Sequence, residues 1–369
     1  MEYLPFTKPF IDDETIQGVC DVLRSGWLAT GPKVHEFEST LSGYLGGRIV
    51  KSFTSATGAL EVALQMCGIG PGDEVITPAM SFTATPNVIM RVGAKPVFVD
   101  VGIDSRNIDL DQVEKAITPN TRAIMPVHFA GLPVDCDRLY DIANRRGLRV
   151  IEDAAHAIGT KWQDKRIGSF GDIASFSFHP NKNMTTIEGG ALSFSDSAEA
   201  KKLDQLRFHG IVKDEEGNQD VVLAGGKYNL SDVAAMVGLG QLKHLDEFNR
   251  KRSELVGHYF QRWMLDDCLL PQRGEGHSWH MFAPLIPFER YGISRQHFIK
   301  KMHEKGIGVG IHYPALHLFS LYRKLGYKDG DFPNAERIGR ETVTLPLFPM
   351  MQFADVERVV DAVSGVLES

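Results

Sequence analysis

The chain has 369 residues, 43% hydrophobic and 24% charged, which is ordinary for a globular protein with a large core and two domains. Forty basic and forty-seven acidic side chains give a net charge of −7, and no Lys/Arg block stands out. These values exclude a dedicated nucleic-acid or anionic-membrane surface. Because the sequence shows neither a leader pattern nor a run of about 18 apolar residues, we expect a cytoplasmic protein with no membrane partner.

The cysteines are far apart in the sequence and show neither a Cys-x-x-Cys pair nor histidines at ligand spacing: Cys20, Cys67, Cys136 and Cys268. We expect reduced thiols and no metal site.

From about residue 50 to 240, short β-rich runs alternate with helical patterns, which predicts a largely parallel α/β sheet flanked by helices. The predicted helices are 57–67, 111–117 and 135–146, and the predicted strands are 74–77, 96–100, 123–128, 150–152, 174–178 and 191–194. The last three strands leave no room for a helix between each pair. We therefore expect a mixed sheet with some antiparallel pairing.

Beyond residue 230 the pattern changes. It predicts a long helix over 230–252, strands over 281–286 and 306–312, and helices over 294–305 and 354–367. We expect a large α/β domain over 1–250, including an N-terminal segment 1–35, and a smaller α+β domain over 251–369. The charged, glycine-rich stretch 214–226 is the best candidate for a mobile surface loop.

Lys182 is the most informative residue. It follows a short apolar strand and precedes a Thr/Gly-rich turn, where it could form a Schiff base with an aldehyde cofactor. To transfer protons it must be neutral when free, so we expect a pKa below the usual value of about 10.4. A lone lysine near a strand end is more often solvated, but Ser177 and the Glu-Gly-Gly at 188–190 favour a cofactor site.

Other segments fit the needs of pyridoxal phosphate (PLP). Thr54-Ser-Ala-Thr-Gly58 opens a helix whose N–H groups and hydroxyls could hold a phosphate, although an ordinary helix cap is the alternative. Phe82 could stack on the pyridine ring, and Asp153 could hold its nitrogen protonated, which makes the ring a stronger electron sink. Taken singly, Phe82 is more often a core residue and Asp153 more often a helix cap.

Together these motifs resemble those of the DegT/DnrJ-type sugar aminotransferases, in the same order, from Pro5 to about Pro349. The motifs are Ser25-Gly-Trp-Leu-Ala-Thr-Gly-Pro32, Thr54-Ser-Ala-Thr, Ser81-Phe-Thr-Ala-Thr85, Pro126-Val-His128, Glu152-Asp-Ala-Ala-His156, Ser177-Phe-His-Pro-Asn-Lys182, Glu188-Gly-Gly190 and Lys227-Tyr-Asn-Leu-Ser-Asp232. Within the family the chain looks most like the UDP-4-amino-4-deoxy-L-arabinose aminotransferases, through Lys227-Tyr-Asn-Leu, Ser278-Trp-His280 and Gly306-Ile-Gly308 with His312 following.

The resemblance implies a fold type I, PLP-dependent homodimer with active sites at the subunit interface. Lys182 would be the Schiff-base lysine and Asp153 the partner of the ring nitrogen. The remaining cofactor contacts would be Ser55, Ala56, Thr57, Phe82, His156 and Ser177, with Asn229 or Lys227 reaching in from the second subunit. L-Glutamate would be the amino donor, leaving as 2-oxoglutarate. The acceptor would be a keto sugar, for which we expect a nucleotide link, and the product would enter cell-surface polysaccharide or lipopolysaccharide.

The chain departs from the family pattern at Ala56, where many members have Gly, at Ile187, which replaces Gly or Ala, and at Lys227, which replaces Asn. The last two bear on the acceptor pocket and the cross-subunit contact. Candidates on the acceptor side are Trp27, His179, Glu188, Lys227, His312 and Tyr313. For His179 and His312 the alternatives are a simple wall position and ordinary packing or surface polarity.

Three other functions are less compatible with the sequence. A dehydratase branch of the family carries histidine in place of the lysine, so the presence of Lys182 favours transamination. A non-enzymatic regulator would not need Lys182 and Asp153 together, and the sequence shows no helix-turn-helix pattern. A nicotinamide oxidoreductase is disfavoured because Gly68-Ile-Gly-Pro-Gly72 follows a helix, whereas a dinucleotide loop follows a strand.

Overall fold

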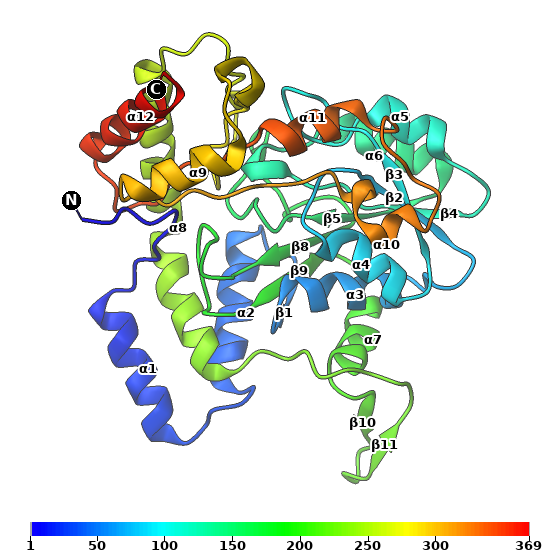
Figure 1. Cartoon of the computed structure of the whole chain (residues 1–369). Helices are drawn as coiled ribbons and strands as arrows, with labels where there is room; N and C mark the ends of the chain where they lie inside the picture. The colour runs from blue at the N-terminus through cyan, green and yellow to red at the C-terminus, as the bar shows by residue number, and fades with distance from the viewer. Residues whose placement is uncertain (1, 369) are drawn as a thin grey trace.

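A seven-stranded sheet forms the centre of the computed structural model, which describes residues 2–368 (Figure 1). The strand order is β1-β9-β8-β5-β4-β2-β3, and β9 runs antiparallel to both its neighbours while the remaining pairs are parallel. The expected mixed, mostly parallel sheet is therefore confirmed. The strands are β1 (Ile49–Phe53), β2 (Glu74–Pro78), β3 (Lys95–Val99), β4 (Thr121–Ile124), β5 (Arg149–Asp153), β8 (Ile173–Ser177) and β9 (Gly190–Phe194).

Helices bury both faces of the sheet. Successive strand residues point to opposite faces, so Ile151 packs in a cluster with helices α3 (Ala56–Met66), α4 (Ala84–Arg91) and α7 (Ser197–Arg207), while Val150 packs with α5 (Leu110–Ala116) and α6 (Cys136–Arg146). A third cluster joins β8 to α2 (Pro32–Tyr44). Burial on both sides explains why the strands read as apolar runs.

Side-chain caps fix where several of these helices begin. Asp109 accepts hydrogen bonds from the first N–H groups of α5, Asp135 caps α6 in the same way, and Ser55 caps α3 by accepting from Gly58 N at 3.1 Å. Such caps satisfy N–H groups that have no partner inside the helix. The ordinary helix cap, which was the alternative to a phosphate site for residues 54–58, is therefore present at Ser55.

The long helix α8 (Asp232–Arg262) continues past the predicted end at Arg252 and across the boundary expected at residue 250. Its first residue, Asp232, accepts hydrogen bonds from Gly31 N, Lys33 N and Val34 N, and so caps α2. Helix α1 (Asp13–Ser25) packs along α8 (Figure 1). Helix α8 therefore connects the N-terminal segment, the sheet and the C-terminal part.

In the C-terminal part, helices α9 (Arg295–Glu304), α10 (Ser320–Arg323), α11 (Pro333–Glu341) and α12 (Phe353–Leu367) form, but the two predicted strands do not. Residues 281–286 and 306–312 make isolated β-bridges, among them Phe282 with Leu345 and Gly310 with Thr344. Pro284 has no N–H for a continuous ladder. At Gly308 a side chain would collide with the N-terminal segment, since a Cβ would lie 2.8 Å from Phe6 N.

Two further predictions differ from the structure. The strand predicted over 123–128 ends at Ile124, and beyond Pro126 only Val127 forms a bridge, to Asp153. The expected loop 214–226 instead contributes to a hairpin of β10 (Ile211–Lys213) and β11 (Gln219–Val221), which projects away from the sheet (Figure 1). A second hairpin, β6 (Lys161–Trp162) and β7 (Lys165–Arg166), follows β5.

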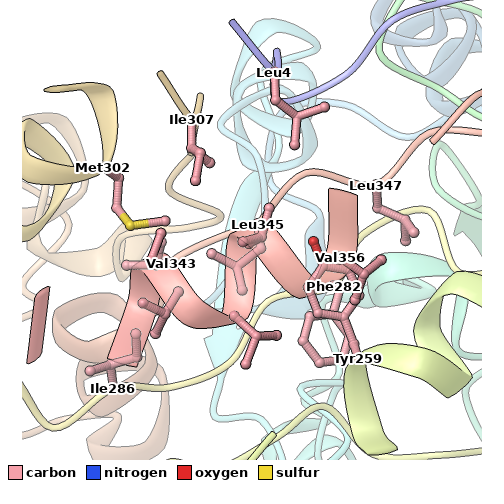
Figure 2. Close-up of a cluster of buried hydrophobic side chains, with 14 of the residues drawn as sticks. Leu4, Tyr259, Phe282, Ile286, Met302, Ile307, Val343, Leu345, Leu347 and Val356 are labelled. Atoms are coloured by element: carbon pink, nitrogen blue, oxygen red, sulfur yellow. The ribbon is translucent and has the colours of Figure 1, made fainter. Parts of the chain in front are cut away.

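The C-terminal core gathers apolar side chains from α8, α9, α12 and the bridged segments between them (Figure 2). The rings of Tyr259 and Phe282 stack there with centroids 4.5 Å apart. Leu4 joins the same cluster and so anchors the N-terminal segment. Across residues 2–368 no helix is long and apolar enough to cross a bilayer.

We expect Phe282→Ala to destabilise the protein by about 3–5 kcal/mol, because it removes a fully buried ring and leaves a cavity. The shift of the urea unfolding midpoint of the apo-protein measures this loss. Met264→Ala is the matched control, since Met264 is 80% exposed and its truncation should change little. Equal midpoints for the two variants would contradict the packing described.

Candidate functional site

A cavity of about 350 Å³ lies at the carboxyl ends of β5 and β8, where α/β sheets commonly bind ligands. Most of the residues predicted from the sequence line it: Ser55, Ala56, Thr57, Phe82, Asp153, His156, Ser177, His179, Lys182, Glu188, His312 and Tyr313. The fold thus brings together side chains spread over more than two thirds of the chain.

At one end of the cavity is the first turn of α3. The N–H groups of Ala56 and Thr57 have no acceptor within residues 2–368, and Thr57 and Ser177, which carry hydroxyls, line the same cavity. Gly190, the first residue of β9, approaches this turn so closely that a Cβ would lie 2.4 Å from Ala56 N. Free N–H groups at a helix N-terminus are suited to binding a phosphate.

Asp153 ends β5 and is 5% exposed. Its Oδ2 accepts a hydrogen bond from Thr85 Oγ1 at 2.8 Å, and its Oδ1 accepts from Ala155 N at 3.2 Å. Burial raises the pKa of this carboxyl, while the two hydrogen bonds and the charge of Lys182 oppose the rise. Thr85 lies within the Ser81–Thr85 motif, but its contact with Asp153 was not predicted from the sequence.

Lys182 follows β8 and lines the same cavity as Asp153. Burial lowers the pKa of its amine to about 8, with the charge of Asp153 acting against that fall. Within residues 2–368 the amine makes no hydrogen bond. The lowered pKa expected from the sequence therefore has its cause in burial, and a free amine is available in the cavity.

His156 carries its proton on Nε2. Its Nδ1 accepts a hydrogen bond from Ala130 N at 3.3 Å, so Nε2–H donates to Tyr313 Oη at 3.2 Å. Burial holds the pKa of this imidazole well below the usual value. His156 is therefore a neutral side chain with a fixed tautomer.

Behind His156 lies a second neutral histidine that the sequence analysis did not assign. The ring of His280 is 4.6 Å from that of His156, and its Nδ1–H donates to Asn183 Oδ1 at 3.1 Å. The direction follows because Asn183 Nδ2 already donates to Ser278 O and to the side chain of Asn249. Burial lowers the pKa of His280 as well. The only sequence signal was the family motif Ser278-Trp-His280, which carries no spatial information.

Polar and aromatic side chains line the mouth of the cavity. Phe82 is 56% exposed, with its ring 5.9 Å from that of Tyr313. His179 Nε2 lies 3.8 Å from Glu188 Oε1. His312 Nδ1 is bonded to Thr344 Oγ1 at 2.8 Å, and burial lowers its pKa to about 4.

Trp27, Lys227 and Asn229 do not line this cavity in the single chain. Asn229 Nδ2 donates to Thr30 Oγ1, and Lys227 Nζ donates to Asn229 Oδ1. Trp27 is 57% exposed. Contact from a second subunit was predicted for Asn229 or Lys227, and an acceptor-side position for Trp27 and Lys227; all of these remain predictions.

The donor set fits PLP. The residues offer an unpaired amine for the aldehyde, a buried carboxylate for the ring nitrogen, free N–H groups for the phosphate and an exposed aromatic ring for the pyridine face. No group of three or more His, Cys, Asp or Glu side chains suited to a metal ion occurs in the part of the chain that the structure describes.

Residues 9–364 match the model of the DegT/DnrJ/EryC1/StrS aminotransferase family, and the chain belongs to this family. The resemblance noted from the sequence motifs is thereby confirmed at the family level.

Solved structures agree over the whole chain. Spr1654 from Streptococcus pneumoniae in its PMP form, assigned as a sugar aminotransferase, has 33% identity and a TM-score of 0.93, covering 99% of each chain. DesV from S. venezuelae has 33% identity and a TM-score of 0.92 over 100% of each chain. PseC from Helicobacter pylori, an aminotransferase involved in pseudoaminic acid biosynthesis, has 28% identity and a TM-score of 0.94 over 100% of each. The protein is a PLP-dependent sugar aminotransferase with the fold predicted.

We expect the amine of Lys182 in the apo-protein to react with acetic anhydride along a curve that bends near pH 8, because its neutral form appears above that pKa. An unperturbed lysine would bend near pH 10.4. Competitive labelling followed by mass spectrometry of the peptide measures the curve without cofactor or turnover.

Asp153→Asn is the matched variant for this measurement. Since the Asp153 carboxylate raises the pKa of Lys182, its removal should shift the bend below pH 8. An unchanged curve would show that the two groups do not interact.

Proposed function

We propose that this aminotransferase moves the amino group of L-glutamate to a keto sugar carried on a nucleotide, as a homodimer in the cytoplasm. The observation that carries the proposal is the lowered pKa of Lys182, about 8, beside the buried carboxylate of Asp153 in one small cavity. Bound PLP supplies an electron sink for the carbanion left when a donor loses its α-proton.

Lys182 is suited to hold and move that proton. With a pKa of about 8, a substantial fraction of its free amine is neutral near physiological pH and can accept a proton at Nζ. Asp153, fixed by Thr85 and the backbone at Ala155, would keep the ring nitrogen protonated. His156, whose Nε2–H donates to Tyr313 Oη, lines the same cavity without adding charge.

The size of the cavity favours two half-reactions in sequence. About 350 Å³ is at the lower end of the range for small-molecule sites and must also hold the cofactor. Glutamate and the acceptor would therefore occupy the same space in turn, which predicts ping-pong kinetics.

For the acceptor, the neutral and polar groups at the mouth suit sugar hydroxyls. His312 is held neutral by its lowered pKa of about 4, and Tyr313, His179 and Glu188 add donors and acceptors around it. The sequence resemblance supports UDP-4-keto-arabinose or a 4-keto-6-deoxyhexose as the sugar. By the same resemblance, the product would be used for cell-surface polysaccharide or lipopolysaccharide.

Exposed apolar side chains support the homodimer. Trp27, Leu28, Phe208, Val221 and Val222 are each at least 41% exposed. Val221 ends β11 of the projecting hairpin and Val222 follows it, and exposed apolar side chains that gather in one place often mark interfaces. Burial against a second copy would also bring Asn229 or Lys227 to the partner's cavity.

The first test adds glutamate to the PLP-loaded enzyme without acceptor. We expect loss of the visible absorbance of the lysine-bound cofactor and release of 2-oxoglutarate; a panel of keto sugars should then restore turnover. Lys182→Ala should lower turnover by at least about 10²–10⁴-fold, because it removes the proton-transfer group. Sugar consumption without 2-oxoglutarate would instead identify a dehydratase, and normal turnover by Lys182→Ala would contradict the assignment.

The second test mixes Lys182→Ala and Asn229→Ala subunits after mild dissociation. If Asn229 serves the partner's cavity, mixed dimers contain one intact site, and equal mixing should give about a quarter of the wild-type activity. If Asn229 serves its own subunit, mixing gives no rescue. Sedimentation of each variant confirms that both still form dimers.

A further inference from the structure

Ile187 is a conformational outlier directly before Glu188 and Gly189, which line the cavity. Its φ is +72°, in the left-handed region where a β-branched side chain crowds the backbone. The side chain is 54% exposed and belongs to none of the apolar core clusters of residues 2–368. The next residue, Glu188, lines the cavity. Neither local preference nor core packing explains an isoleucine here.

Buried neighbours fix the backbone of this turn without help from the isoleucine side chain. Thr185 Oγ1 donates to Phe178 O at 3.0 Å and accepts from Ile187 N at 2.8 Å. Thr186 Oγ1 donates to Glu188 O at 2.9 Å, and Phe178 N donates to Gly189 O at 2.9 Å. Glycine would therefore adopt the same conformation without strain. Strain of this kind persists where the surrounding structure imposes it and is concentrated at functional sites.

The position of Ile187 indicates which substrate it meets. The cavity of about 350 Å³ must hold the cofactor and the reacting part of each substrate. Glutamate is small enough to remain inside, whereas the part of a nucleotide-linked sugar beyond the sugar ring must pass over the rim. Phe82, also apolar and 56% exposed, is among the residues that line the cavity.

We propose that Ile187 is a specificity-determining residue for the acceptor, forming an apolar wall at the cavity mouth against the base of a nucleotide-linked keto sugar. The inference rests on the proposed function, because it requires an acceptor that carries a nucleotide. Loss of one such apolar contact typically changes discrimination by about tenfold or more.

The test compares Ile187→Gly with the parent holoenzyme. We expect KM for the nucleotide-linked keto sugar to rise about tenfold, with little change in kcat. The rate at which glutamate bleaches the cofactor and KM for the same keto sugar lacking the nucleotide should not change. Calorimetry with UDP and dTDP should show about tenfold weaker binding of whichever nucleotide the parent prefers.

Two further variants serve as controls. Ile187→Val keeps the apolar wall and should retain KM within about twofold. Gln163 has a similar positive φ, +52°, at an exposed position in the β6–β7 hairpin. This hairpin contributes no residue to the cavity lining, so Gln163→Gly should leave every readout unchanged. The melting temperature of Ile187→Gly should be equal to or above that of the parent.

The outcomes separate the inference from the proposed function. If the parent aminates nucleotide-linked sugars and Ile187→Gly does so with the same KM, the inference fails and the proposed function stands. If Ile187→Gly also slows the glutamate half-reaction or dissociates the dimer, Ile187 is a structural or interface residue and the inference fails. If the parent neither aminates a keto sugar nor binds UDP or dTDP, both fail.

Discussion

The site depends on one electrostatic arrangement, a carboxylate and an amine buried in the same cavity. Burial raises the pKa of Asp153 and lowers that of Lys182, and the charge of each group opposes the shift of the other. The parallel pairing of β5 with β8 makes this possible, because it sets Asp153 opposite Ser175 and brings the chain beyond β8 past the same edge of the sheet. The amine is thereby free to react, while the carboxylate remains available to a pyridine nitrogen.

Uncharged groups surround Asp153 and Lys182 and orient them without adding another charge to the cavity. Thr85 and Ala155 N fix both oxygen atoms of Asp153. The rings of His156 and His280, both kept neutral by burial, lie with centroids 4.6 Å apart, and Asn183, next to Lys182 in sequence, bonds to His280. A cation in place of either histidine would lower the pKa of Lys182 further by repulsion. The absence of charge on His156 and His280 therefore helps to set the pKa of Lys182.

The two ends of the cavity differ in exposure. At the first turn of α3, β9 approaches so closely that only glycine fits at position 190. At the other end, exposed side chains such as Phe82 and Glu188 come from turns beside the strands. Functional residues often lie on such turns, while the strands hold the scaffold fixed.

The sequence by itself determined the alternation of strands and helices up to residue 240, the positions of Lys182 and Asp153 after their strands, and the cofactor, because these signals are local or lie in contiguous motifs. It could not place the strands predicted over 281–286 and 306–312, since Pro284 and the approach of the N-terminal segment to Gly308 prevent continuous ladders. Nor could it reveal Thr85 or His280, whose partners Asp153 and Asn183 are 68 and 97 residues away. Tertiary structure alone decided those contacts and the pKa of Lys182, because hydrogen bonding and desolvation depend on distances in space that a linear sequence does not contain.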